Sequence, residues 1–168
     1  TSAVTYQKLE DILPALYEEG KNPFIVVLDG VTDVRNFGAI ARTCEVAGVH
    51  AIVIPAKGSV TVNADAIKTS AGALHTIPVC REQNLREAIV FLKNSGVKVV
   101  AATEKAARFY TDSDYSVPTA IVMGAEDTGV AADHLRASDE LVRIPQFGSI
   151  QSLNVSVAAG VLPIYNDK

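Results

Sequence analysis

Short apolar runs that alternate with helical stretches constrain the fold of this chain more than any other feature. The runs are rich in Val, Ile and Ala, and they occupy residues 24–28, 51–54, 76–79, 97–102, 119–123 and 141–144. Continuous runs of this kind are typical of strands that are buried on both faces of a parallel sheet. Their alternation with helices predicts an α/β domain with a mostly parallel sheet and helices on both faces.

Apolar residues at helical spacing predict the intervening helices. We expect helices at residues 4–19, 36–48, 63–74, 84–94, 131–138 and 153–162. Pro14 should weaken the middle of the first helix, and the turn residues that end at Pro23 should terminate it. The sequence therefore divides into an N-terminal helix and linker, residues 1–22, and an α/β domain, residues 23–168.

Composition narrows the class of protein. Hydrophobic residues make up 48% of the 168 residues and charged residues 20%, which excludes a disordered chain. We see neither an apolar run near the ~18 residues of a membrane span nor a secretory signal, and we expect a cytoplasmic protein. Cys44 and Cys80 lie in apolar segments without CxxC spacing, which predicts reduced core thiols. Three scattered histidines predict no metal site.

Charge leaves the question of a nucleic-acid partner open. The net charge of −4 argues mildly against an extended nucleic-acid surface. Lys and Arg nevertheless outnumber the acids within residues 56–108, whereas acids dominate residues 109–140. A basic face for RNA and an ordinary solvated surface both explain this distribution.

A polar loop near the C-terminus predicts a ligand site. The strand that ends before Pro145 and the helix predicted from Leu153 flank this loop, and such a loop leaves backbone groups available for a ligand. Its polar side chains are too many to enter a core without partners; they are Ser149, Gln151, Ser152 and Asn154. A single serine in this position would more simply cap the helix.

A second motif surrounds the end of the strand at 119–123. It runs from Ile121 to Gly129, and its Gly124 permits a close backbone approach to a ligand. The motif is neither GxGxxG nor a Walker A sequence, which excludes the usual dinucleotide and triphosphate sites. Glu126 either borders a site or serves as a carboxylate at a helix N-terminus.

A third motif, from Asp29 to Thr43, contains Asn36 and Arg42. These two residues are six positions apart and so do not share one helical stripe. Both can face the carboxyl edge of the sheet if Asn36 is the N-cap of its helix. The alternative is that Asn36 only caps and that Arg42 only lies along the helix surface.

Taken together, the three motifs resemble those of the SpoU (TrmH-type) RNA ribose 2′-O-methyltransferases of the SPOUT superfamily, over a region from about Pro23 to Tyr165. The resemblance implies a Rossmann-like fold whose C-terminal part, roughly residues 119–165, forms a deep trefoil knot. It also implies S-adenosylmethionine as cofactor, a homodimer whose site is completed across the interface, and no metal or membrane partner. Within the family, the residues of these stretches resemble most the bacterial 23S rRNA guanosine 2′-O-methyltransferases. The alternatives are a tRNA ribose 2′-O-methyltransferase and a non-catalytic RNA- or nucleotide-binding module.

The family's functional positions carry over to matching residues of this chain. The implied catalytic residues are Asn36, Arg42, Glu126, Ser152 and Asn154. The implied cofactor-binding residues are Thr103, Gly124, Ile144 and Leu153. An arginine remains protonated near neutral pH because its pKa lies above ~12. Arg42 is therefore either the family's proposed base or an electrostatic stabiliser of the reacting alkoxide. Gln146 and Asp127 depart from the usual family pattern without removing any of these residues.

Overall fold

The computed structural model describes residues 6–30, 34–56, 77–124 and 129–143. Within these ranges, all paired strands are parallel and form one sheet in the order β1-β4-β3-β2-β6-β5-β7. The strands are β1 (Tyr6–Gln7), β2 (Phe24–Asp29), β3 (Ala51–Pro55), β4 (Val79–Glu82), β5 (Lys98–Ala102), β6 (Thr119–Gly124) and β7 (Glu140–Val142). The helices are α1 (Leu9–Glu18), α2 (Val34–Ala47), α5 (Leu85–Asn94) and α6 (Ala132–Ala137), with a 3-10 turn η1 (Tyr110–Asp112). The predicted α/β class is confirmed.

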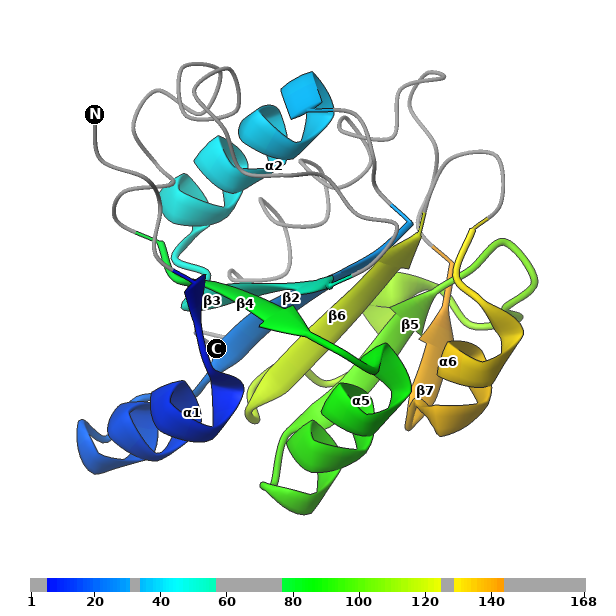
Figure 1. The fold of residues 1–168 in the computed structure, drawn as a ribbon. Coiled ribbons are helices and arrows are strands. Elements are labelled where there is room, and N and C mark those ends of the chain that lie inside the picture. The colour runs from blue at the N-terminus through cyan, green and yellow to red at the C-terminus, as the bar shows by residue number, and fades with distance from the viewer. Residues whose placement is uncertain (1–5, 31–33, 57–76, 125–128, 144–168) are drawn as a thin grey trace.

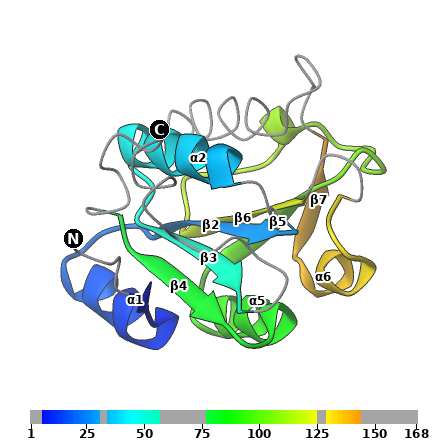
Figure 2. The same ribbon diagram turned by 45° about the horizontal axis from the view of Figure 1, so that its top comes forward.

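Helices cover both faces of this sheet, as predicted. Helix α2 lies on one face, and α1, α5 and α6 lie on the other (Figure 1). The turned view shows the same three layers (Figure 2). Side chains alternate along each strand, so Val26 and Leu28 of β2 pack in the core on the α2 side. Ile25 and Val27 of the same strand pack with α1 and α5.

The chain start differs from the prediction. Residues 4–19 were expected to form one helix, but Tyr6 and Gln7 form β1, which pairs with Val79 and Cys80 of β4. Helix α1 begins only at Leu9 and continues through Pro14. A strand of two residues is too short to show the pattern of apolar residues that predicts a strand. Tyr6 and Gln7 were therefore assigned to the helix that follows them.

Two other element boundaries were also misplaced. The strand expected at 76–79 is β4 at Val79–Glu82, so that prediction was wrong at residues 77 and 78, and residue 76 lies outside the described residues. The strand expected at 141–144 is β7 at Glu140–Val142. Helix α5 begins where it was predicted because the Asn84 side chain accepts the Glu87 N–H at 3.1 Å, which is a standard N-cap.

Several predictions fall outside the described residues. They include the helices at 63–74 and 153–162 and most of the segment expected to be knotted. Among the described residues, Cys44 and Cys80 are buried and free, as predicted, and burial raises the pKa of each thiol to about 12. None of the helices that the structure describes is long and apolar enough to cross a membrane.

Candidate functional site at the carboxyl edge of the sheet

The strand order creates a topological switch point between β2 and β6. These strands are neighbours in the middle of the sheet, and their last residues, Asp29 and Gly124, are partners in register. The helix that follows β2 is α2, whereas the helix that follows β6 is α6 on the opposite face (Figure 1). A crevice outside the carboxyl ends of two such strands is where open α/β sheets bind ligands. The fold therefore places the candidate site beside Asp29 and Gly124.

The neighbouring backbone leaves no room for a side chain at Gly124. A Cβ added to Gly124 would lie 2.1 Å from the carbonyl carbon of Gly129 and 2.3 Å from the nitrogen of Val130. The sequence had indicated that this glycine admits a ligand, but the space of its missing side chain is occupied by the returning chain. Gly129 itself has a φ of +66°, in the left-handed region that favours glycine. Gly124 and Gly129 thus allow the two described ends of the second motif to lie close together.

Asp29 is a site residue to which the sequence assigned no role. Its Oδ2 accepts the Ala131 N–H at 2.8 Å and lies 2.7 Å from Nδ1 of His134. The Asp29 and His134 side chains are each only 16% exposed. An acidic residue that ends an otherwise apolar strand is the only signal in the sequence, because its partners lie more than a hundred positions away.

Thr103 lies at the same edge, directly after β5. Its N–H donates to the Val142 carbonyl at 2.9 Å, and its own carbonyl accepts the Ala106 N–H at 3.3 Å. Its Oγ1 accepts the Lys105 N–H at 3.3 Å. Because the main chain of Thr103 is used in these bonds, its hydroxyl proton is the group it can offer to a ligand.

Arg143 fixes the direction in which the chain leaves β7. Its N–H donates to the Arg108 carbonyl at 2.8 Å, and its carbonyl accepts the Tyr110 N–H at 3.1 Å. The Arg143 guanidinium lies over the Phe109 ring, 4.6 Å from the ring centroid. The residue immediately before Ile144 is therefore held firmly at the carboxyl edge.

Asn36 does not hold the position in α2 that the sequence indicated, and Arg42 lies further along the same helix. Asn36 lies inside α2, which includes Val34 and Arg35, so the premise that Asn36 is the N-cap was wrong. Arg42 is exposed, and it follows Ala41, which is buried against the sheet. It lies six residues, or about 9 Å along the helix axis, beyond Asn36. Arg42 forms no ion pair with another residue that the structure describes.

The remaining predicted site residues lie outside the described residues; they are Glu126, Ile144, Ser152, Leu153 and Asn154. In the part of the chain that the structure does describe, no group of three or more His, Cys, Asp and Glu side chains has the arrangement of a metal site.

Comparisons with curated proteins find relatives of high similarity. The chain is 42% identical over 155 residues to the 23S rRNA (guanosine-2′-O-)-methyltransferase RlmB of Yersinia pestis, an alignment that covers 92% of this chain and 63% of that protein. It is 36% identical over 161 residues to the putative TrmH family tRNA/rRNA methyltransferase YacO of Bacillus subtilis, covering 96% of this chain and 65% of the relative. The chain thus spans less than two thirds of the length of either protein.

Solved structures show the same fold. An AdoMet-bound rRNA methyltransferase from Sinorhizobium meliloti matches with a TM-score of 0.79 and 32% identity, over 96% of this chain and 60% of that one. The TrmH/SpoU tRNA modifying enzyme of A. aeolicus matches with a TM-score of 0.70 and 30% identity, over 94% of this chain and 82% of that one. The profile of the SpoU rRNA Methylase family matches residues 23–164, which confirms the resemblance drawn from the three motifs. By sequence and by fold, this chain belongs to the SpoU rRNA methylase family.

Proposed function

We propose that this chain catalyses the S-adenosylmethionine-dependent methylation of an RNA ribose 2′-hydroxyl, with guanosine in 23S rRNA as the target. The observation that carries the proposal is the likeness to the AdoMet-bound rRNA methyltransferase, which extends over 96% of the chain at 32% identity. The name of the Yersinia pestis relative supports both the guanosine and the ribosomal RNA. The switch point between β2 and β6 is the place where open α/β sheets bind ligands, and such a cofactor would bind there.

The described residues fit a nucleoside cofactor. Leu28 and Met123, next to the ends of β2 and β6, are buried and give the edge an apolar floor. Thr103 offers a hydroxyl donor, and Gly124 brings main chain without a side chain. An apolar pocket with a few placed polar groups is the usual environment of an adenosine. We propose that Thr103, Gly124, Ile144 and Leu153 bind S-adenosylmethionine.

The bound cofactor supplies an electrophilic methyl group on a sulfonium centre. Transfer of that methyl group to the ribose 2′-oxygen would break the carbon–sulfur bond, leave S-adenosylhomocysteine and release the hydroxyl proton to solvent. We propose that Asn36, Ser152 and Asn154 orient the nucleotide, and that Glu126 lies beside them. Arg42 stabilises the negative charge that develops on the 2′-oxygen, or it binds the adjoining phosphate. A role as the base is disfavoured because a guanidinium is a poor base near neutral pH.

A homodimer is part of the proposal. Arg42 lies exposed on α2, without an ion pair among the described residues, and a second subunit can bring its own carboxyl edge against that surface. We propose that each site is completed across this interface and that the protein works in the cytoplasm, where it meets its RNA. Mixing Arg42→Ala subunits with Gly124→Ala subunits tests the shared site, because activity should reappear in mixed dimers. No recovery would assign each Arg42 to its own subunit.

Two structural features complete the proposal. Residues 23–168 are the methyltransferase domain, and residues 6–22 before it contribute strand β1 and helix α1 to the same sheet and its helical layer. The segment from about 119 to 165 forms the deep trefoil knot of the SPOUT fold. The likeness to SpoU structures, with TM-scores of 0.70 to 0.79, supports both statements. A knot is otherwise rare enough that no strand pattern would suggest it.

Transfer RNA is the second candidate substrate, favoured by the match to a TrmH/SpoU tRNA modifying enzyme at 30% identity. A single experiment separates the candidates. The protein is incubated with labelled S-adenosylmethionine and either rRNA or tRNA from a strain that lacks the corresponding gene. Nucleoside mass spectrometry should then find 2′-O-methylguanosine in the 23S rRNA. Methylation of tRNA alone would reassign the substrate, and cofactor binding without transfer to either RNA would indicate a non-catalytic module.

A further inference from the structure

Two hydrogen bonds converge on one oxygen at the end of β2. Oδ2 of Asp29 accepts the Ala131 N–H at 2.8 Å and meets Nδ1 of His134 at 2.7 Å. A carboxylate oxygen only accepts, so Nδ1 of His134 carries the proton in this pair. Both side chains are mostly buried, which makes these charge-assisted bonds costly to lose.

The contact ties together two segments that are far apart in the chain. Asp29 ends β2 and begins the motif from Asp29 to Thr43, whereas Ala131 is the N-cap residue of α6 and His134 belongs to α6 itself. The Ser138 hydroxyl donates to the His134 carbonyl at 2.8 Å and strengthens the same short helix. Asp29 therefore sets where α6 begins relative to the sheet.

The position of this segment determines the surroundings of Gly124. Gly129 and Val130 immediately precede Ala131, and their backbone would lie within 2.4 Å of a Cβ on Gly124. Gly124 is also the register partner of Asp29. Any shift of Ala131 away from the sheet moves the backbone that packs against Gly124.

We propose that Asp29 is a positioning residue for the cofactor site: its Oδ2 holds the backbone from Gly129 to His134 against the ends of β2 and β6. The inference rests on the proposed function, in which the main chain of Gly124 contacts S-adenosylmethionine. Asp29 would position the backbone that packs against Gly124. Asp29 acts through this backbone and not on the reacting atoms.

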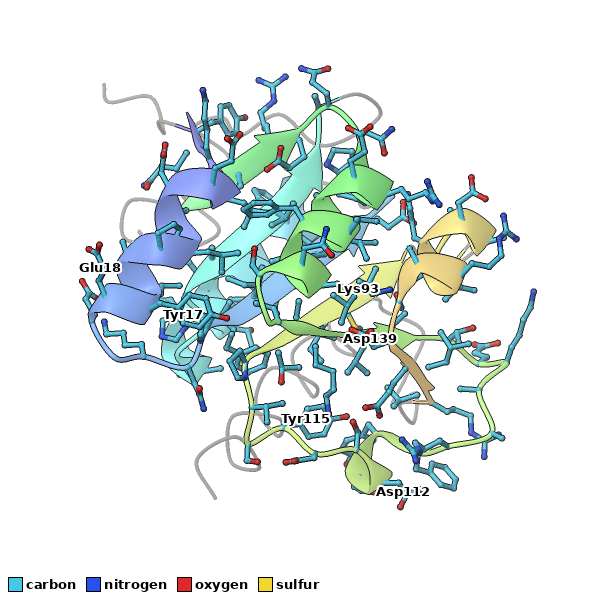
Figure 3. The ribbon with its side chains drawn as sticks, turned by 90° about the horizontal axis from the view of Figure 1, so that it is seen from below. Tyr17, Glu18, Lys93, Asp112, Tyr115 and Asp139 are labelled. Carbon is cyan, nitrogen blue, oxygen red and sulfur yellow. The ribbon has the colours of Figure 1, made fainter. Side chains whose placement is uncertain are left out.

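Three substitutions in the full chain test the role. Asp29→Leu keeps a similar shape and removes both acceptors. Asp29→Asn retains one carbonyl oxygen, and one oxygen suffices because both bonds fall on Oδ2. Asp139→Leu is the matched control: Asp139 also accepts a backbone N–H, from Val99 at 2.8 Å, but at the opposite edge of the sheet near Lys93 (Figure 3).

The readout is the dissociation constant of S-adenosylmethionine by calorimetry, together with KM and kcat for methyl transfer. Asp29→Leu should weaken cofactor binding by about tenfold or more and raise KM more than it lowers kcat. Asp29→Asn should recover most of that loss. Asp139→Leu should lower the melting temperature and leave cofactor affinity unchanged. A folded Asp29→Leu protein with wild-type affinity, or an Asn variant as impaired as the Leu variant, would overturn the proposal.

Hydrogen exchange at the Ala131 amide tests the positioning role of Asp29 without a measurement of enzyme activity. The Ala131 amide should exchange faster in Asp29→Leu than in wild type and remain protected in Asp29→Asn. His134→Ala, which removes one of the two bonds, should give an intermediate rate. If wild type binds no S-adenosylmethionine, the proposed function fails. The positioning role is then decided by exchange alone, and unchanged protection of Ala131 in Asp29→Leu would refute it.

Discussion

Among the described glycines whose surroundings the structure gives, Gly124 has the least room for a side chain. Backbone atoms of Gly129 and Val130 occupy the place of its missing Cβ. Gly124→Ala should therefore lower the free energy of unfolding by roughly 2 kcal/mol or more and also weaken cofactor binding, because the backbone of Gly129 and Val130 must move away to admit a methyl group. Denaturant unfolding and calorimetry measure the two effects.

Gly20→Ala is the matched control for this prediction. Gly20 has a φ of +74° with nothing within 4 Å of an added Cβ, so the substitution incurs only backbone strain of about 1 kcal/mol. Its cofactor affinity should equal that of wild type. A Gly124→Ala protein as stable as Gly20→Ala, with normal affinity, would contradict the close contact at the second motif.

Arg42 should matter for catalysis more than for folding. It is exposed on α2, so Arg42→Ala should change stability by less than about 0.5 kcal/mol. The same change should lower kcat by roughly 100-fold while cofactor affinity stays near normal. Arg86→Ala, at another exposed helical arginine on α5, is the control and should be fully active. Near-normal kcat in Arg42→Ala would leave this residue as an ordinary surface arginine.

At the level of residues, the sequence predicted correctly where two residues of the candidate site lie relative to the strands. It placed Gly124 and Thr103 at strand ends because apolar runs stop there. It misjudged Asn36, because a cap and an interior position of the first turn differ by only a few residues in a pattern. Asp29 received no role because a hydrogen bond to Ala131 depends on the order of strands, which no local pattern contains.

At the scale of elements, a charged cluster joins β5, β7 and the connection between β5 and β6. Glu140 accepts from the Ser113 hydroxyl at 2.7 Å and from Arg108 at 2.8 Å, and it lies 3.3 Å from Nζ of Lys98. Burial alone raises the pKa of Glu140, but Ser113, Lys98 and Arg108 together outweigh it and lower that pKa. Tyr115, in the connection between β5 and β6, is labelled in Figure 3, and Nζ of Lys98 lies 5.6 Å from the centroid of its ring.

This lowered pKa predicts a dependence of stability on pH. The folded protein holds Glu140 ionised more strongly than the unfolded chain does, so the stabilisation is full above the unfolded pKa of about 4.3. It is lost as the pH falls through the folded value. Glu140→Gln should therefore lower the free energy of unfolding by about 1–2 kcal/mol at pH 7, with a smaller deficit at about pH 3.5.

Urea unfolding at the two pH values measures this deficit. Glu18→Gln, at an exposed glutamate on α1, is the control and should be nearly neutral at both (Figure 3). A Glu140→Gln deficit that grows as the pH falls would contradict the direction of the shift.

Element positions were predictable where apolar periodicity was strong. Strands β2, β3 and β6 and helix α5 lie within a residue of their predicted bounds. The edge strand β1 was missed, and β4 was displaced. These two strands pair with each other at one side of the sheet. Arg81 and Glu82 of β4 are polar, so this part of the chain lacks the continuous apolar run that predicts a strand.

For the whole molecule, the proposed dimer makes a simple prediction. Light scattering at micromolar concentration should give twice the mass of 17.8 kDa. The exposed Arg42 surface of α2 should become protected in hydrogen exchange as the protein concentration rises. A monomer at that concentration would contradict the site shared between subunits. It would not contradict the proposed position of the cofactor at the ends of β2 and β6.

The sheet order is the whole-molecule property that no sequence pattern supplied. Alternating runs predicted a parallel sheet, but they do not state that β2 and β6 are neighbours or that α2 and α6 leave on opposite faces. Those two facts place the switch point, and with it the candidate site, at the ends of β2 and β6. They follow from long-range packing of two buried cores, which single segments do not encode.

Hydrogen exchange with and without S-adenosylmethionine tests the central claim most directly. If the cofactor binds at the switch point, protection should increase at the carboxyl ends of β2 and β6 and in the segment from Gly129 to His134. Peptides at the opposite edge, such as the one containing Val99 and Asp139, should exchange at unchanged rates. Saturating cofactor that protects the opposite edge, or that leaves the ends of β2 and β6 unchanged, would contradict the account.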